Sequence, residues 1–198
     1  VAGVLAPPPP PPRGALRCAV LRYGEALLER YPSLGTRLLH QGGLFTLLAT
    51  QYANARPTSE ASRRRAAVHG APARGQQEPP TATQEQRRLA LRLMGVALAD
   101  AVGGAKLPAA VAERLSTALP LLVASASDHR DRGTCRGLAA QRAAAEATLH
   151  AVRLLGGCSP LGLSRAWAHG LRWLERLTAD DDARVAACAF DICAALVA

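Results

Sequence analysis

Residues that favour β-strands are scarce in this sequence of 198 residues. Aromatic residues account for 4% of the chain, isoleucine occurs once and valine 11 times, whereas alanine and leucine occur 42 and 30 times. Alanine and leucine have the highest helix propensities, while β-branched and aromatic residues favour strands. The composition therefore excludes a mainly β protein and predicts an all-α one.

Long uncharged hydrophobic runs are also missing. A membrane-spanning helix needs about 20 consecutive apolar residues, whereas the longest uncharged helical segment, residues 115–127, contains Pro120 and is shorter than this. Residues 1–6 are apolar but run directly into prolines, which is not the form of a secretory signal. We therefore expect no membrane insertion.

The signatures of catalysis, cofactor binding and metal binding are missing too. No Gly-x-Gly-x-x-Gly, Walker or Gly-x-Ser-x-Gly pattern occurs, and the five histidines form no HxH, HExxH or HxxxH pair. The string His129-Arg130-Asp131 is similar to part of the kinase catalytic loop, but Arg136 stands where that loop needs asparagine. We expect a protein that is not an enzyme, with no cofactor and no catalytic or metal-ligating residues.

The cysteines and histidines are expected to be structural. Five cysteines, an odd number with no CxxC pair, do not fit a secreted disulfide framework or a zinc finger. We expect them to be reduced and buried in a cytosolic protein. His40 and His150 are expected near helix ends, where a positive charge interacts favourably with the helix dipole.

Positive charge is in excess, and nearly all of it is arginine. The net charge is +9 and the pI about 10.3, yet Lys106 is the single lysine among 24 basic residues. A joint abundance of Ala, Gly, Pro and Arg is typical of a GC-rich coding sequence, and a basic chain is also typical of proteins that bind polyanions. The sequence leaves both explanations open.

The composition divides the chain into four parts. Residues 1–14 contain six consecutive prolines and are expected to be a disordered spacer of polyproline II type. Residues 15–52 form a first helical unit, residues 53–82 an Arg- and Pro-rich disordered insertion, and residues 83–198 the remaining helical repeats. Because position 1 is valine and the last residues form an uncapped apolar helical pattern, we expect a piece of a longer protein.

Apolar residues at intervals of three and four predict seven or eight helices. In the first helix, Leu16, Val20, Tyr23 and Leu27 are expected to form the apolar face, with Leu28 widening it. Thr83 followed by Gln86 has the form of a capping box and predicts a helix start. Residues 180–182, three aspartates, are expected at the N-terminus of the last helix, where negative charge is favourable.

Glycine pairs are expected to end helices and to form the turns between them. These structural turn residues are Gly42, Gly43, Gly103, Gly104, Gly156 and Gly157. The intervals between the pairs exceed one armadillo or HEAT unit of about 40–47 residues. The spacing therefore favours stacked helical hairpins without demanding a strict repeat, and a compact helical bundle remains the alternative.

Four residues are candidates for contact with a partner. Arg63, Arg64 and Arg65 form a basic run in the insertion, which could touch an acidic partner or simply be solvated. Trp173 is a candidate because tryptophan is enriched at interface hot spots, although packing at the edge of the core also explains it.

Two segments resemble the signatures of armadillo and HEAT repeats. Residues 38–48, Leu-Leu-His-Gln-Gly-Gly-Leu-Phe-Thr-Leu-Leu, are similar to the armadillo junction, where a helix ends in glycine and a long helix opens with an apolar pair. Residues 182–190 resemble the Asp-x-x-Val-Arg-x-x-Ala start of a second HEAT helix, although here Arg184 precedes Val185. The resemblance implies an armadillo/HEAT-like α-solenoid of stacked helical hairpins with one long disordered insertion.

Residues 42–52, together with the arginine-rich insertion and residues 173–178, are similar to the C-terminal region of the rotatins, large armadillo-like proteins of centrioles and ciliary basal bodies. This resemblance implies a non-catalytic scaffold that binds other proteins in the cytoplasm, at the centrosome or basal body. The alternative from charge alone is a basic helical module that binds nucleic acid. Scattered helical arginines with acidic neighbours argue against nucleic acid as the partner.

Overall fold

The computed structural model describes residues 13–31, 33–55, 80–102, 107–128, 134–158 and 172–197. Within these ranges every regular element is an α-helix, so the all-α prediction is confirmed for them. The helices are α1 Arg13–Arg30, α2 Ser33–Gln41, α3 Gly43–Ala55, α5 Pro80–Val102, α6 Ala109–Ala126, α7 Cys135–Cys158, α9 Arg172–Thr178 and α10 Ala183–Val197.

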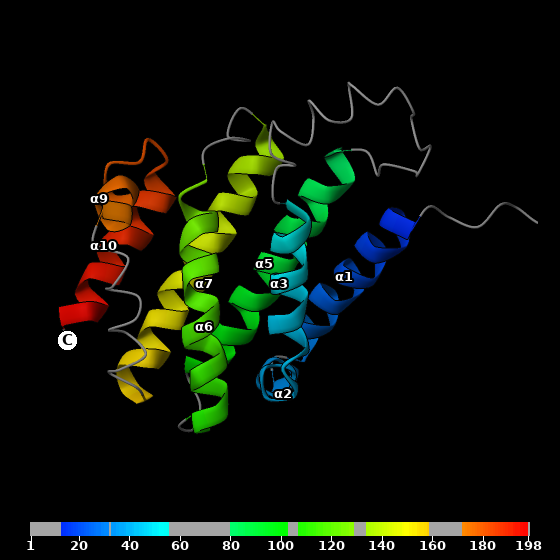
Figure 1. Cartoon of the computed structure of the whole chain (residues 1–198), viewed down its shortest axis with the longest axis horizontal. Coiled ribbons are helices and arrows are strands. Elements are labelled where there is room, and N and C mark those ends of the chain that lie inside the picture. Colours follow the sequence, from blue (N-terminus) through cyan, green and yellow to red (C-terminus); the bar gives the residue numbers. More distant parts are fainter. Residues whose placement is uncertain are drawn as a thin grey trace, which may run out of the picture.

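The helices lie in two rows. The first, called the long row here, consists of α1, α5, α7 and α10, each packed against the next (Figure 1). The second, the short row, consists of α3, α6 and α9: α3 packs against α6, and α6 and α9 border a common groove. Contacts of α3 with α5, α6 with α7 and α9 with α10 join the two rows. The chain therefore alternates between the rows.

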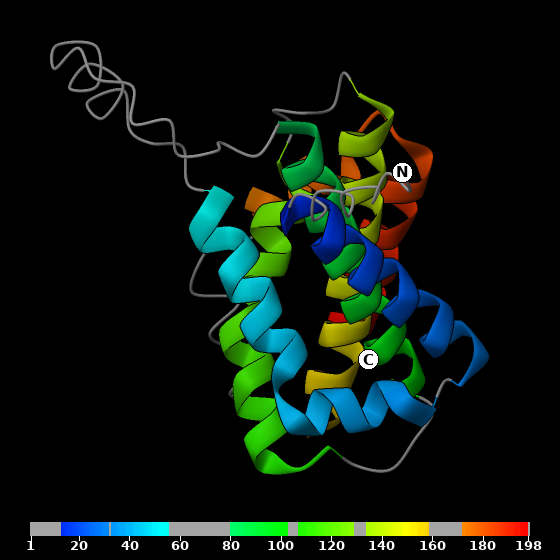
Figure 2. The ribbon, with the colours of Figure 1, turned by 90° about the vertical axis from the view of Figure 1, so that its right-hand side faces the viewer.

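The direction of the helices follows the same alternation. In Figure 1 the four helices of the long row run from the top of the view to the bottom, whereas α3 and α6 run back toward the top. Helix α2 lies across one end, between α1 and α3, and packs against α5 (Figure 2). Neighbours in the long row are thus parallel, although they are far apart in sequence.

The core lies mainly along α5, α6 and α7, where apolar residues at intervals of three and four form buried stripes. The residues of these stripes that are less than a tenth exposed are Leu89, Leu91, Leu93, Ala97, Leu98, Val111, Leu115, Leu119, Leu122, Ala145, Leu149, Val152 and Leu155. Helix α7 adds a face of buried alanines that allows α5 to approach closely. A Cβ placed on Gly95 of α5 would lie 3.7 Å from the Cβ of Ala147.

Helix α1 buries Leu28, as expected, but leaves most of the expected apolar face exposed. The exposed fractions of Leu16, Val20 and Tyr23 are 56%, 61% and 67%, whereas Cys18, Leu21 and Leu28 are buried. The helix carries two apolar stripes on different sides, and packing against α5 uses the second. Periodicity identifies both apolar stripes but does not show which of them packs against the rest of the protein.

The turn between α2 and α3 depends on Gly42. Its φ is +75°, a conformation that glycine adopts without strain, and its N–H donates to the carbonyl of Leu39 at 3.1 Å. Gly43 is already the first residue of α3. Gly103 and Gly104 lie outside the described residues. The prediction for Gly156 and Gly157 is wrong, because α7 continues through both to Cys158.

The start of α5 also differs from the prediction. The helix begins at Pro80, a residue suited to the first helical position because it has no N–H to leave unpaired. Thr83 is therefore inside the helix and does not cap it. Gln86 is buried, and its side-chain amide donates to the carbonyl of Gly14 at 3.4 Å, which connects α5 to α1.

Helices α2 and α5 approach closely where Gly35 faces Ala97. A Cβ on Gly35 would lie 2.9 Å from the Cα of Ala97. Next to this point, Asp100 accepts hydrogen bonds from the hydroxyl of Thr36 at 2.8 Å and from its backbone N–H at 3.4 Å. The carboxylate of Asp100 thus connects the first turn of α2 to α5.

We predict that Gly35→Ala lowers the free energy of unfolding by about 1–3 kcal/mol, because the added methyl group would push two backbones apart. Urea denaturation followed by circular dichroism measures the change. Gly43→Ala is the matched control: its Cβ would meet no atom within 4 Å, so the variant should be as stable as the parent or slightly more stable. Equal destabilisation of both variants would contradict the close contact.

Candidate protein-binding surface

The described residues contain no group of three or more His, Cys, Asp or Glu side chains that could hold a metal ion. Cys18 is buried and Cys188 and Cys193 are half-buried, and none of these three is in a disulfide. The expectation of burial is wrong for Cys135, which is exposed at the first residue of α7. Burial raises the pKa of the Cys188 thiol, with Glu146 and Asp191 contributing, so this thiol is not activated as a nucleophile.

The two described histidines differ from each other. His40 is in the last turn of α2, as expected, and is exposed. His150 is not near a helix end but inside α7, where it is half-buried. Burial and the neighbouring Arg153 lower its pKa, which favours the neutral imidazole. The prediction of a favourable dipole interaction is therefore wrong for His150.

Several arginines of the long row are held in ion pairs between helices. Glu85 of α5 accepts hydrogen bonds from Arg88 at 2.9 Å and from Arg22 of α1 at 3.2 Å. These bonds, that of Arg88 first, lower the pKa of Glu85 to about 2. One turn further along, Arg92 pairs with Glu25 and Glu29 of α1. The basic residues at this interface are thus matched by carboxylates.

A groove of about 480 Å³ lies on the long row, between α5, α7 and α10. Small residues such as Gly95 and Ala143 line it, and arginines border it. Because Arg88, Arg92 and Arg142 each pair with a carboxylate, much of the positive charge of this groove is neutralised. The groove is therefore a weak candidate for binding an anion.

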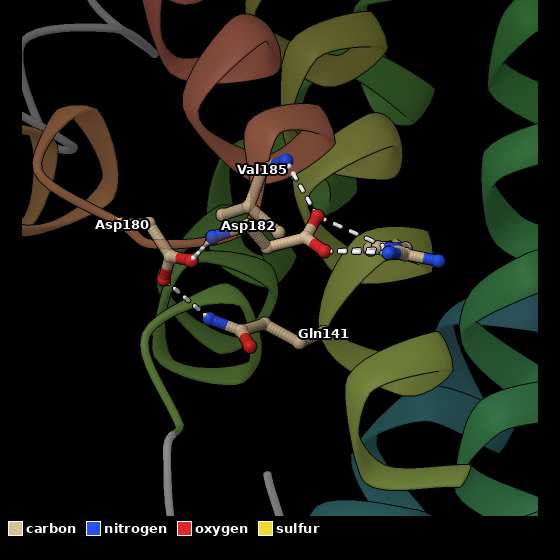
Figure 3. A network of polar contacts seen from close by, with 5 residues as sticks. Gln141, Asp180, Asp182 and Val185 are labelled. Atoms are coloured by element: carbon tan, nitrogen blue, oxygen red, sulfur yellow. Dashed lines mark hydrogen bonds and ion pairs between the residues drawn. The ribbon is translucent and has the colours of Figure 1, made fainter. Parts of the chain in front are cut away.

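The junction between α7 and α10 is a polar network (Figure 3). Asp182 precedes α10 and accepts the N–H of Val185 at 3.2 Å, so it is the helix cap. The same carboxylate pairs with Arg142 of α7 at 2.5 Å. Asp180 accepts the side-chain amide of Gln141 at 3.0 Å. The expectation of aspartates at this N-terminus is confirmed, and they also connect two helices.

Trp173 lies in a second groove, which we call the Trp173 groove. It has a volume of about 410 Å³ between α6 and α9, and its lining residues are Pro120, Val123, Ala124, Ser127, Arg172, Trp173 and Arg176. Trp173 is half-buried and packs against the hydrophobic core. Pro120 interrupts the backbone hydrogen bonds of α6, because it has no N–H to donate. The groove is thus an apolar recess beside an aromatic ring.

Two arginines border this recess. Arg172 and Arg176 are one turn apart on α9, both are exposed, and both line the groove beside Trp173. Neither forms a salt bridge within the described part of the chain. The Trp173 groove therefore combines an apolar floor with a positive rim, unlike the groove on the long row.

Of the four predicted contact residues, the structure describes Trp173. Trp173 is at the edge of the core and partly accessible, which is compatible with both interpretations of this residue. Arg63, Arg64 and Arg65 lie outside the described residues. The sequence analysis did not identify Arg172, Arg176, Pro120 and Val123, because α6 and α9 meet through tertiary packing. The sequence does contain one signal for this site: Arg172 and Arg176 are four residues apart, and Trp173 follows the first of them.

Helix α6 is long and apolar enough to cross a membrane by length and composition, with a mean hydropathy of 1.2 over 18 residues. Half of these residues are buried within the protein, where α6 packs against α3 and α7. The core helix of a folded domain has the same properties, so this feature is weak evidence for a membrane span.

Comparison with known proteins identifies no relative of this chain. No protein-family model matches the sequence, and no curated protein and no solved structure is similar enough to count as a match. The functional argument therefore depends on the surfaces described above.

We predict that the contribution of Asp182 to stability is lost in acid. Its pKa in the folded chain is lowered from 3.8 to about 2, first by the hydrogen bond from Arg142. The ionised cap therefore stabilises the fold above about pH 4, and this stabilisation disappears as the pH falls toward 2. At pH 7, Asp182→Ala should lower the free energy of unfolding by about 1 kcal/mol.

Urea denaturation of both proteins at several pH values measures this difference, which should shrink between pH 4 and pH 2. Asp191→Ala is the control, because Asp191 is 60% exposed and pairs with Arg153 at 3.7 Å. Its effect on stability should be close to zero. A difference for Asp182→Ala that does not change with pH would contradict the ionised cap.

Proposed function

We propose that the chain is a non-catalytic protein-binding scaffold of armadillo/HEAT type. Three observations support an α-solenoid: the chain alternates between two rows, the helices of the long row are parallel, and each contacts mainly its neighbours. The helices of the long row begin at Arg13, Pro80, Cys135 and Ala183, which are not evenly spaced. The proposed solenoid is therefore irregular, with connections of different lengths.

The observation that carries the proposal is the Trp173 groove. An apolar recess with a partly accessible tryptophan is the kind of pocket in which a partner's apolar anchor residue binds. The positive rim formed by Arg172 and Arg176 favours carboxylates beside that anchor. We infer that the partner is a protein segment, such as an amphipathic helix, with apolar anchors flanked by Asp or Glu.

A nucleic-acid partner is the second candidate, because the net charge is +9. Phosphate binding requires arginines that are available to neutralise the backbone. Arg22 and Arg92 are instead paired with carboxylates of the neighbouring helix, Arg142 with Asp182 before α10, and Arg88 with Glu85 of its own helix. This pairing favours a protein partner over nucleic acid.

We also propose a location at the centriole or ciliary basal body, from the similarity of residues 42–52 to rotatins. Residues 42–52 include the turn at Gly42 and most of α3. Fluorescence microscopy of the tagged chain in ciliated cells tests the location: signal at basal bodies supports it, and signal confined elsewhere contradicts it.

We predict that a synthetic helical peptide with leucine anchors and flanking glutamates binds the chain, with binding measured by isothermal titration calorimetry. The double substitution Arg172→Glu, Arg176→Glu should raise Kd at least about tenfold, because it reverses the charge of the rim. These side chains are exposed, so the variant should remain folded. The tightest binding is expected at low salt, since exposed charges are screened.

Arg37→Glu provides the matched control, because Arg37 is an exposed arginine on α2, away from the groove. Its Kd for the peptide should equal that of the parent chain. An equal rise in Kd for the Arg37→Glu variant and for the double variant would show a non-specific effect of net charge. Preferential binding of a DNA oligonucleotide, with affinity falling steeply as salt rises, would favour the nucleic-acid alternative.

A further inference from the structure

The side of α1 that faces away from α5 is apolar and largely exposed. This outer face of α1 consists of Leu16, Val20, Tyr23 and Leu27, and the first three are more than half exposed. The opposite side of the same helix buries Leu21 and Leu28. A helix that is apolar on both sides is normally packed on both sides. No helix of the described chain covers the outer face of α1.

The other end of the long row has a similar surface on α10. Its outer face consists of Ala187, Phe190, Ala194 and Val197, all of them exposed. The exposed fractions of Phe190 and Val197 are 61% and 89%. The opposite side of α10 packs against α7 and buries Val185, Ala189 and Ile192. Both terminal helices of the row are thus apolar on two sides.

The geometry of the row indicates how these two faces could be covered. Each neighbouring pair in the long row is parallel, and α1 and α10 are at opposite ends of it (Figures 1 and 2). If a second copy is shifted along the row, its α1 lies beside the α10 of the first copy. The two helices are then parallel, as α5 and α7 are within one chain.

The residue types of the two faces are complementary in size. The outer face of α1 presents large side chains, whereas the outer face of α10 alternates alanines with Phe190 and Val197. Within the chain, α5 and α7 pack in the same way, with leucines of α5 and alanines of α7 buried at their interface. We propose that copies of this chain stack head to tail, with α1 of one copy against α10 of the next. The contact continues the interface that already exists within the row.

A head-to-tail contact of this kind uses two different surfaces and need not close into a ring. The assembly therefore has no fixed size, and its mean mass increases with concentration. Each end copy keeps one unoccupied face. A charged substitution on either face should stop the assembly from growing. A chain altered on its α1 face and a chain altered on its α10 face should still form one contact with each other.

Analytical ultracentrifugation of the full chain tests the proposal. The weight-average mass should rise from the monomer mass of 20.7 kDa to at least twice that value between about 10 and 300 μM. Val20→Glu and Phe190→Glu should each remain monomeric. An equimolar mixture of these two variants should form a dimer and nothing larger, because one intact α1 face meets one intact α10 face.

Thr117→Glu is the control, because Thr117 is an exposed residue of α6 in the short row. It should assemble like the parent chain. Circular dichroism of all variants checks that they are folded, which is expected because the substituted residues are exposed. A parent chain that stays monomeric would overturn the proposal. Assembly by Val20→Glu or Phe190→Glu alone would overturn it too, because it indicates a contact between like faces.

Discussion

Helices α5 and α7 approach each other closely, and the other helices of the long row pack on one of these two. Their contact is possible because small residues face each other: Gly95 and Ala147 bring the two backbones together. Alanine buries little apolar area by itself, so the stability of this contact comes from dense packing of many atoms. The leucines of α5 and α6 then enclose the contact and supply most of the hydrophobic burial.

Charge has a supporting role in this arrangement. Glu85 is paired with Arg88 of its own helix and with Arg22 of α1, and Asp182 with Arg142 of α7, and these bonds lower the pKa values of both carboxylates to about 2. These pairs fix the relative position of α1, α5, α7 and α10 after apolar packing has brought the helices together. They also occupy arginines that would otherwise bind anions, which leaves the Trp173 groove with an exposed positive rim.

The sequence predicted the helices better than their surfaces. Leucine and alanine at helical intervals located the core of α5, α6 and α7, because those helices have one dominant buried side. On α1 the same method placed Leu28 correctly but otherwise chose the exposed side, because two apolar stripes compete there and only tertiary packing decides. It also placed a cap at Thr83, although Pro80 had already started the helix. The Trp173 groove could not be predicted, since its walls come from α6 and α9.

The central claim is that the contact of α5 with α7 holds the array together, and hydrogen exchange of backbone amides tests it most directly. Amides exchange most slowly where opening requires global unfolding. The account predicts the slowest exchange in α5 and α7, with faster exchange in α1 and α10 at the ends of the row. Equal protection of all helices, or the slowest exchange in α1 or α10, would contradict it.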